Sequence, residues 1–240
     1  MLELKNVSKK YGGVVQALSD VSFSVGQGEI IGLFGENGAG NTTLMKSILG
    51  FQSFRGKILL DGEPVSRKNI GRLSFGTCEH SFFPRLTAME HASFYKAQFG
   101  TFNEKRFKKL MEFFDLPKYR PIRFFSSGMQ NQFEVIMALC QGADYILLDE
   151  PFVNYDVFNR EDFYKLLAGI LEPHETIILS THLIDEVSGF IDRAVMIHEG
   201  KLISDIKVCD LEEQGTTLID YVKNLYGYEK DRVAKALSNM

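Results

Sequence analysis

Long apolar runs are missing from the sequence. The strongest ones, residues 145–148 and 176–179, have the length of single β-strands, whereas about 20 apolar residues are needed to cross a bilayer. Residues 1–5 also lack the apolar core that is typical of a secretory signal peptide. We therefore expect a protein that is soluble or peripheral to a membrane rather than inserted in one.

Cysteine is scarce, and no charge of one sign dominates. Cys78, Cys140 and Cys209 are widely spaced, odd in number and form no C-x-x-C pair, which favours a reducing compartment. The net charge of −4 lacks the basic excess that is typical of nucleic-acid-binding proteins, so we expect no nucleic-acid partner. The sequence has no internal repeat, and its 240 residues suffice for one large domain or one domain with a subdomain.

What the sequence does contain is a glycine-rich loop between a strand and a helix. An apolar run at residues 29–34 predicts the strand, and apolar residues spaced by three and four predict a helix over residues 42–49. A loop this poor in side chains lets backbone N–H groups turn toward a phosphate, and the helix N-terminus adds its own. We therefore predict that the phosphates are bound by Gly35, Glu36, Asn37, Gly38, Ala39, Gly40, Asn41, Thr42 and Thr43.

One position departs from the phosphate-loop pattern, which requires Lys and then Ser or Thr after the second glycine. Thr42 fits, and its hydroxyl is placed for a Mg²⁺ ion, but the lysine position holds Asn41. A lost hydrogen bond to a charged group costs about 1.5–3 kcal/mol in binding. A lost charge in the transition state costs roughly 10²–10³ in rate.

The N-terminal region predicts antiparallel strands. Residues 1–28 alternate apolar and polar side chains around two glycine turns. Tyr11, beside the first turn, is either a platform for a nucleotide base or an ordinary half-buried aromatic residue, and spacing alone favours the latter. Residues 56–64 predict a hairpin, and residues 73–78 a further strand.

Residues 87–139 predict helices, with a capping box at Thr87–Glu90 and a further helix that begins at Asn103. This block is rich in phenylalanine, which indicates either core packing or an aromatic face that docks a partner. Ser126 is a good N-cap for the last of these helices. Ser127 and Gly128 expose free backbone N–H groups there, which makes this helix start a second potential anion site, although taken alone it indicates only a capped helix.

Two later strands end in side chains that carry chemistry. The buried strand at 145–149 ends in Asp149 and Glu150, where a Mg²⁺ ligand and a residue that polarises water belong in a phosphate-loop protein. The strand at 177–181 is followed by His182, which should face the same crevice. Residues 192–206 predict a final hairpin, and we find no chemistry in residues 210–240.

Together these motifs resemble the ATP-binding subunit of an ABC transporter, from about residue 2 to residue 206. The resemblance implies an α/β fold with a P-loop NTPase core, a mostly parallel sheet, an N-terminal antiparallel β subdomain and a helical subdomain at about 84–140. The cassette would comprise residues 1–206, and residues 207–240 would form a tail of mixed loop and helix.

The resemblance also implies roles for individual residues. Tyr11 would stack on adenine, and Thr42 and Asp149 would hold Mg²⁺. Glu150 would be the catalytic carboxylate, with His182 as the switch histidine. The remaining nucleotide contacts would come from the signature motif, the Q-loop and the D-loop, namely Ser126, Ser127, Gly128, Glu79 and Asp156. At the Q-loop either Glu79 or His80 replaces the usual glutamine, and we favour Glu79.

The implied cofactors are ATP and Mg²⁺. The implied partners are a second ATP-binding subunit, in a homo- or heterodimer, and a separate transmembrane permease at the cytoplasmic face of the cell membrane. Glu79 resembles the residue found at that position in some exporters of antibiotics and bacteriocin-like peptides, so we expect an exporter of such a compound. The alternative is a hydrolysis-deficient regulatory subunit paired with a competent ATPase. A soluble ABC protein of translation or DNA repair ranks last, because those resemble tandem cassettes or carry long coiled-coil insertions.

Overall fold

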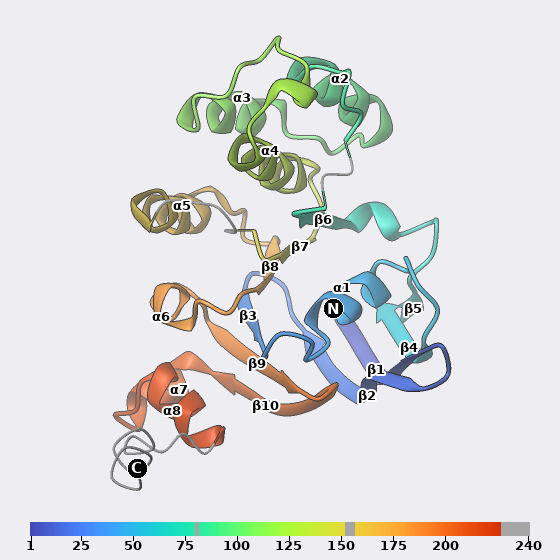
Figure 1. Cartoon of the computed structure of the whole chain (residues 1–240), viewed down its shortest axis with the longest axis vertical. Coiled ribbons are helices and arrows are strands. Elements are labelled where there is room, and N and C mark those ends of the chain that lie inside the picture. Colours follow the sequence, from blue (N-terminus) through green and yellow to red (C-terminus); the bar gives the residue numbers. More distant parts are fainter. Residues whose placement is uncertain (80–81, 152–156, 227–240) are drawn as a thin grey trace, which may run out of the picture.

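The computed structural model describes residues 1–79, 82–151 and 157–226, and the side chains of all these residues except 157–161 (Figure 1). It contains two sheets and a block of helices. The first sheet has the order β2-β1-β4-β5 and is antiparallel. Its strands are β1 (Leu2–Tyr11), β2 (Val15–Val25), β4 (Arg55–Leu60) and β5 (Glu63–Pro64).

The second sheet has six strands in the order β10-β9-β3-β8-β7-β6. All neighbouring pairs from β9 to β6 are parallel, and only the β9–β10 hairpin is antiparallel. The strands are β3 (Ile30–Phe34), β6 (Leu73–Thr77), β7 (Tyr145–Asp149), β8 (Thr176–Ser180), β9 (Arg193–His198) and β10 (Lys201–Lys207). Every residue of β3, β7 and β8 is buried, as expected for continuous apolar strands that are covered on both faces.

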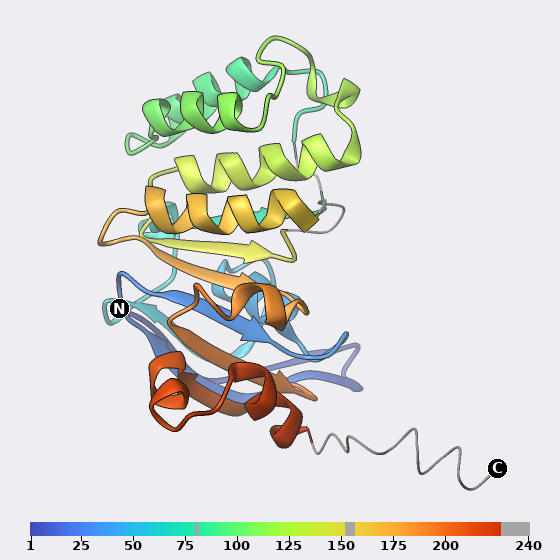
Figure 2. The same ribbon diagram turned by 90° about the vertical axis from the view of Figure 1, so that its left-hand side faces the viewer.

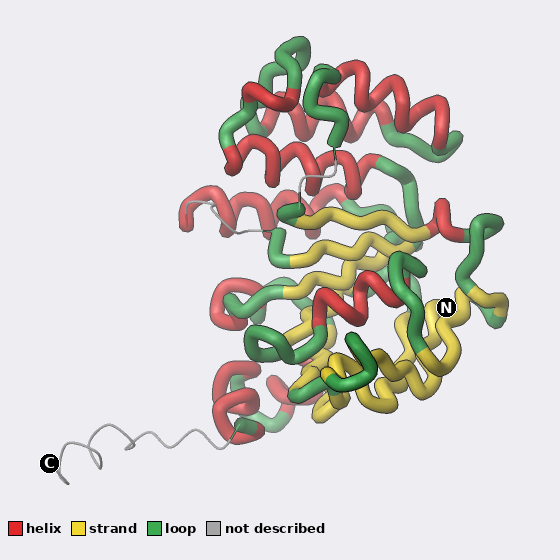
Figure 3. Tube along the Cα trace, turned by 45° about the vertical axis from the view of Figure 1, so that its right-hand side comes forward, coloured by secondary structure: helices red, strands yellow, loops and turns green. Residues whose placement is uncertain are grey.

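Helices cover both faces of the six-stranded sheet. Helix α1 (Asn41–Ile48) packs between the two sheets, in a core shared with alternate residues of β7 such as Leu147. Helices α4 (Ser127–Cys140) and α5 (Val157–Ile170) cover the other face, where α4 packs against Leu148. Figures 2 and 3 show this layering.

The remaining helices lie at two ends of the molecule. Helices α2 (Ala88–Gln98) and α3 (Glu104–Phe113) lie beyond α4 (Figure 1). A 3₁₀ turn at Ile122–Phe124 precedes α4, and another at Ile70–Arg72 precedes β6. Helices α6 (Ile184–Val187), α7 (Val208–Glu213) and α8 (Leu218–Leu225) follow β8 and β10. Among the described residues, no helix combines the length and the apolar character that a membrane span requires. The predicted α/β architecture is confirmed.

Local sequence signals begin several of these helices. Thr87 and Glu90 form a complete capping box at α2, with Thr87 N–H donating to the Glu90 carboxylate over 2.7 Å. The side chains of Asn103 and Ser126 cap α3 and α4 in the same way, by accepting from backbone N–H groups two or three residues into the helix. Each of these helix starts agrees with the prediction from sequence.

A buried ion pair joins the helical block to the six-stranded sheet. Arg106 of α3 donates from Nη1 and Nη2 to the two carboxylate oxygens of Glu175, over 2.7 and 2.8 Å. The guanidinium also donates to the backbone oxygens of Leu139 and Ile170, each over 2.8 Å. Removing one partner of such a buried pair costs about 3–5 kcal/mol because the other charge is left unpaired. Arg106 therefore joins α3 and, through Leu139, the C-terminal end of α4 to the sheet.

Candidate nucleotide-binding site

The glycine-rich loop joins the end of β3 to the start of α1. The N–H of Ala39 donates to Glu36 O and that of Leu44 donates to Gly40 O, each over 2.8 Å. A Cβ on Gly40 (φ +119°) would lie 2.7 Å from Ala17 O, and a Cβ on Gly35 would lie 2.5 Å from Ile197 O. Only glycine therefore fits at these two positions. At Gly38 (φ +84°) an added Cβ would meet no atom within 4 Å, so the loop is open there.

Asn41 is the first residue of α1, and its amide turns back toward the end of β3. Its Nδ2 lies 3.5 Å from Leu33 O, which is a long hydrogen bond. Its Oδ1 is buried and has no hydrogen-bond partner among the residues that the structure describes. A buried acceptor without a partner costs about 1–3 kcal/mol. The neighbouring Thr42 side chain is exposed, as a hydroxyl that meets a ligand must be.

Asp149 and Ser180 end adjacent parallel strands. The two residues are register partners of β7 and β8, which brings the Ser180 hydroxyl to the Asp149 carboxylate. Ser180 Oγ donates to Asp149 Oδ1 over 2.5 Å, and both side chains are buried. This bond holds the carboxylate in one orientation at the carboxyl edge of the sheet. The sequence analysis did not single out Ser180, although its place at the end of a strand next to that of Asp149 was a usable signal.

Glu150 has a left-handed backbone, with φ of 46°. Such a conformation costs about 1–3 kcal/mol in a residue other than glycine. It is held by hydrogen bonds on both sides of the residue. Glu150 N–H donates to Ser180 O over 3.1 Å, and Cys78 Sγ donates to Glu150 O over 3.2 Å. Cys78 is a second residue that sequence reasoning missed.

The Glu150 carboxylate meets His182. Both carboxylate oxygens lie 3.1 Å from His182 Nδ1. Burial raises the pKa of Glu150 above its ordinary value of 4.5, and the hydrogen bond from His182 opposes that rise. A carboxylate beside an imidazole at the edge of a parallel sheet has the groups needed to accept a proton from water. The structure thus brings the two predicted catalytic residues together.

Glu79 follows β6 and pairs with α1. Its Oε1 lies 2.5 Å from the ammonium of Lys46. Lys46 is four residues after Thr42, so both lie on the same side of the helix. This spacing was the signal by which the sequence analysis might have found Lys46. The alternative to Glu79, His80, lies outside the described residues, as does Asp156.

Tyr11 lies at the end of β1 and is 44% exposed. Its hydroxyl donates to Gln52 Oε1 over 2.6 Å and lies 3.4 Å from Thr43 Oγ1. The ring is therefore tied to the helix that begins at the glycine loop, which an ordinary surface tyrosine does not require.

The second predicted anion site lies on the other side of the sheet from the first. Ser126 caps α4, with its Oγ accepting from Met129 N–H over 3.3 Å, and Ser127 and Gly128 form the first turn. Because α1 and α4 pack on opposite faces of the six-stranded sheet, the two helix starts belong to different layers of one chain.

The residues present fit Mg²⁺ only together with phosphate oxygens. In the described parts of the chain, no group of three or more His, Cys, Asp or Glu side chains could hold a metal ion alone. Mg²⁺ commonly binds one or two protein oxygens and completes its shell with phosphates and water. The predicted ligands, Thr42 and Asp149, each carry such an oxygen, and Thr42 follows a loop that is open at Gly38.

Comparisons with known proteins agree with this geometry. A family model described as ABC transporter matches residues 18–153. The ABC transporter ATP-binding protein NatA of Bacillus subtilis (strain 168) is 30% identical over 217 residues, which are 85% of this chain and 88% of that protein. The Nod factor export ATP-binding protein I of Bradyrhizobium diazoefficiens is 30% identical, over 98% of this chain and 79% of its own length. The galactofuranose transporter ATP-binding protein YtfR of Escherichia coli (strain K12) is 31% identical over 96% of this chain, which spans 48% of that protein.

Solved structures show the same fold. A structure described as the ATP binding subunit of an ABC transporter has a TM-score of 0.80 and 25% identity, covering 94% of this chain and 99% of that one. A dimeric ATP-binding cassette bound to ADP and Pi has a TM-score of 0.73 and 22% identity, with coverages of 86% and 98%. The chain belongs to the ABC transporter family, as an ATP-binding subunit of the ATPase type that uses ATP with Mg²⁺.

Proposed function

We propose that this subunit powers the export of a peptide or an antibiotic-like compound. The observation that carries the proposal is the contact of Glu150 with His182, beside Asp149 and its Ser180 partner. These side chains are the chemical half of an ATPase site, and a subunit without turnover has no need to keep them. Export as the direction is supported by the similarity to the Nod factor export ATP-binding proteins and by the carboxylate at Glu79.

Different residues of one chain bind the phosphates, hold the metal ion and activate the water. The backbone N–H groups of residues 35–40 and the start of α1 bind the phosphates. Thr42 and Asp149 hold the Mg²⁺ ion, which when bound shields the phosphate charge. Glu150 orients and polarises the attacking water, and His182 steadies Glu150 and faces the terminal phosphate. Glu79 contributes to the positioning of the metal and the water.

A second ATP-binding subunit completes each site. The start of α4, with Ser126, Ser127 and Gly128, would bind the nucleotide held by the glycine loop of the other chain. Its place on the opposite face of the sheet from α1 supports a head-to-tail arrangement. Asp156 would lie in the same interface, in the D-loop.

We propose that the permease docks on a helical subdomain at about residues 84–140, at the cytoplasmic face of the membrane. The cassette would comprise residues 1–206, with residues 207–240 as its tail. Phe83 and Phe94 are 55% and 46% exposed and contact each other edge to face, with ring centroids 5.7 Å apart. Phe82, in contrast, packs against Phe133. The exposed pair therefore marks the centre of the docking surface.

Two measurements test this function. Inside-out vesicles that contain the permease and the Asn41→Lys form of this subunit should accumulate a labelled peptide antibiotic when ATP is added, and no accumulation would contradict export. Phe83→Glu should abolish co-purification with the permease and leave ATP binding unchanged, with exposed Leu225→Glu, outside residues 84–140, as the control. Unchanged co-purification of Phe83→Glu would contradict the docking surface.

We also propose that Asn41 stands where the family has the lysine of the phosphate loop. Its amide turns back and leaves a buried Oδ1 without a partner among the described residues, which supports this, because a longer side chain would extend across the loop rather than turn back. This observation also favours a second candidate function, a regulatory subunit that binds ATP without turnover beside a competent partner. The neighbouring genes discriminate the two, since an adjacent ATP-binding subunit with an intact lysine favours the regulatory function.

A further inference from the structure

Gln52 connects the aromatic side chain of Tyr11 to the first turns of α1. Its Oε1 accepts from the Tyr11 hydroxyl over 2.6 Å. Its Nε2 donates to Thr43 O over 2.6 Å and to Ser47 Oγ over 3.1 Å. One amide thus uses its acceptor on β1 and its donor on α1, and together with the longer contact of the Tyr11 hydroxyl with Thr43 Oγ1 (3.4 Å) it links the tyrosine to the helix.

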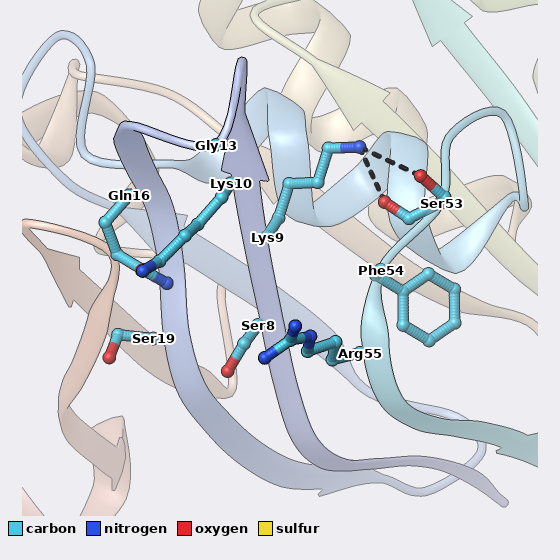
Figure 4. A pocket seen from close by; sticks show the side chains of 9 residues that line it. All are labelled: Ser8, Lys9, Lys10, Gly13, Gln16, Ser19, Ser53, Phe54 and Arg55. Atoms are coloured by element: carbon cyan, nitrogen blue, oxygen red, sulfur yellow. Dashed lines mark hydrogen bonds between the residues drawn. The ribbon is translucent and has the colours of Figure 1, made fainter.

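Lys9 lies over the Tyr11 ring, and its position is fixed by Ser53, the residue after Gln52. Lys9 Nζ lies over the Tyr11 ring, 5.1 Å from its centroid. The ammonium is fixed by donating to Ser53 O over 2.6 Å, and Figure 4 shows it turned to Ser53. A cation on one face of the ring leaves the opposite face for a planar ligand.

Without the contacts to Gln52 and Lys9, the Tyr11 side chain would be free to change rotamer. It precedes two glycines with left-handed φ angles, Gly12 (55°) and Gly13 (74°), and it is 44% exposed. An exposed aromatic side chain next to such a turn populates several rotamers unless a specific bond selects one. A ring that is already fixed loses less freedom when a base stacks on it, which strengthens binding.

We infer that Gln52 is a positioning residue that pre-orients Tyr11 for the adenine base and fixes it relative to the phosphate-binding turn of α1. The inference rests on the proposed stacking of adenine on Tyr11. Gln52 itself touches no nucleotide. Its effect is therefore confined to ligands that have a base, which separates positioning from a general role in the loop.

The test compares ATP with inorganic tripolyphosphate, each titrated calorimetrically into the full chain with Mg²⁺. Gln52→Leu removes the amide and nearly keeps the volume, and Tyr11→Phe removes only the hydroxyl. Each should weaken ATP binding about threefold to tenfold, as for one lost hydrogen bond, and leave tripolyphosphate binding within about twofold. The double variant should bind ATP no more weakly than the weaker single variant, because both changes break the same bond. Gln98→Leu, an exposed glutamine at the end of α2, is the matched control.

Three results would overturn the inference, each in a different way. If Gln52→Leu weakens ATP and tripolyphosphate equally, its role is structural support of the loop. If Gln52→Leu leaves ATP binding unchanged while Tyr11→Ala weakens it, stacking stands and positioning by Gln52 is wrong. If Tyr11→Ala has no effect on ATP binding, the proposed stacking on Tyr11 is wrong as well.

Discussion

The candidate site has two halves, a phosphate half and an acidic half, and each is held in shape by different interactions. The phosphate half, at the start of α1, depends on backbone geometry, with glycine at the places where a Cβ would collide. The acidic half, at the ends of β7 and β8, depends on side chains that hold one another, Asp149 with Ser180 and Glu150 with His182. The phosphate half departs from its pattern at the one position where that pattern requires a charge.

This difference shows where a phosphate-loop site can change without losing its architecture. Replacing a side chain that the backbone does not need leaves the loop shape intact, whereas the acidic half contains a carboxylate whose strained backbone needs neighbours from two strands. At Asn41 the cost is a buried amide oxygen without a partner among the described residues. The comparison predicts that one substitution in the phosphate half raises activity and that removing the proton acceptor or the support of the metal ligand in the acidic half lowers it.

The largest expected effect is a gain. Asn41→Lys should raise steady-state ATP hydrolysis by roughly 10²–10³, because it returns a full charge to the phosphates. Turnover is measured by phosphate release from the purified complex, with the exposed Asn224→Lys as control. If both forms bind ATP and neither releases phosphate, the regulatory function gains support. If the unaltered chain already turns over well, our account of the lysine is wrong.

The acidic half should then respond in the opposite direction. In the Asn41→Lys chain, Glu150→Gln should lower turnover about 10²-fold, within the range for loss of a general base. ATP affinity should be retained, because the change removes only the proton acceptor. Exposed Glu213→Gln should behave as the parent. Substantial residual turnover in Glu150→Gln would assign the base elsewhere.

Ser180 tests whether the acidic side chains support one another. Ser180→Ala removes the 2.5 Å bond to Asp149, so the Mg²⁺ affinity measured in the presence of ATP should fall about tenfold or more, as for other residues that orient a metal ligand. Ser180→Thr keeps the hydroxyl and should recover most of the loss. Equal Mg²⁺ affinity in the alanine and threonine variants would contradict this support.

The pH dependence of ATP turnover in the Asn41→Lys chain should reflect the raised pKa of the buried Glu150. The base works as a carboxylate, and burial raises its pKa above the ordinary 4.5. Turnover should therefore fall with acidification at a higher pH than for an exposed glutamate. Because the hydrogen bond from His182 lowers this pKa, His182→Leu, which has no donor, should move the acid limb of the log kcat profile further up in pH. An acid limb that stays in place would contradict the pairing.

The smallest effect is expected for the ion pair between Lys46 of α1 and Glu79, which follows β6. The Lys46–Glu79 pair is 26% and 62% exposed at its two side chains, so its net stabilisation is about 1 kcal/mol or less. Lys46→Met should change the thermal midpoint by only a few degrees at most. A large change in ATP turnover with unchanged stability would show that Lys46 acts at the nucleotide and not only on Glu79.

Much of the fold and the order of the site motifs could be predicted from the sequence. Apolar strands such as β7, the capping box at Thr87 and the glycine loop are local signals, and each was found where it was expected. The roles of the individual site residues remain predictions, since the structure shows their neighbours but not their ligands. What local patterns could not predict were the contacts that Ser180, Cys78, Lys46 and Gln52 make, because each contact joins segments that are far apart in the chain.

The sequence by itself determined which backbone shapes are possible and which chemical groups are available. The required glycines, the strand-ending carboxylates and the absence of a lysine after Gly40 are all properties of short segments. Tertiary structure decided how these groups are oriented. Parallel pairing set Ser180 beside Asp149, and the α1–β4 connection set Gln52 under Tyr11. The physical reason is that strand register and helix packing bring side chains within hydrogen-bonding distance over 30 or more residues of chain, and no local pattern contains that distance.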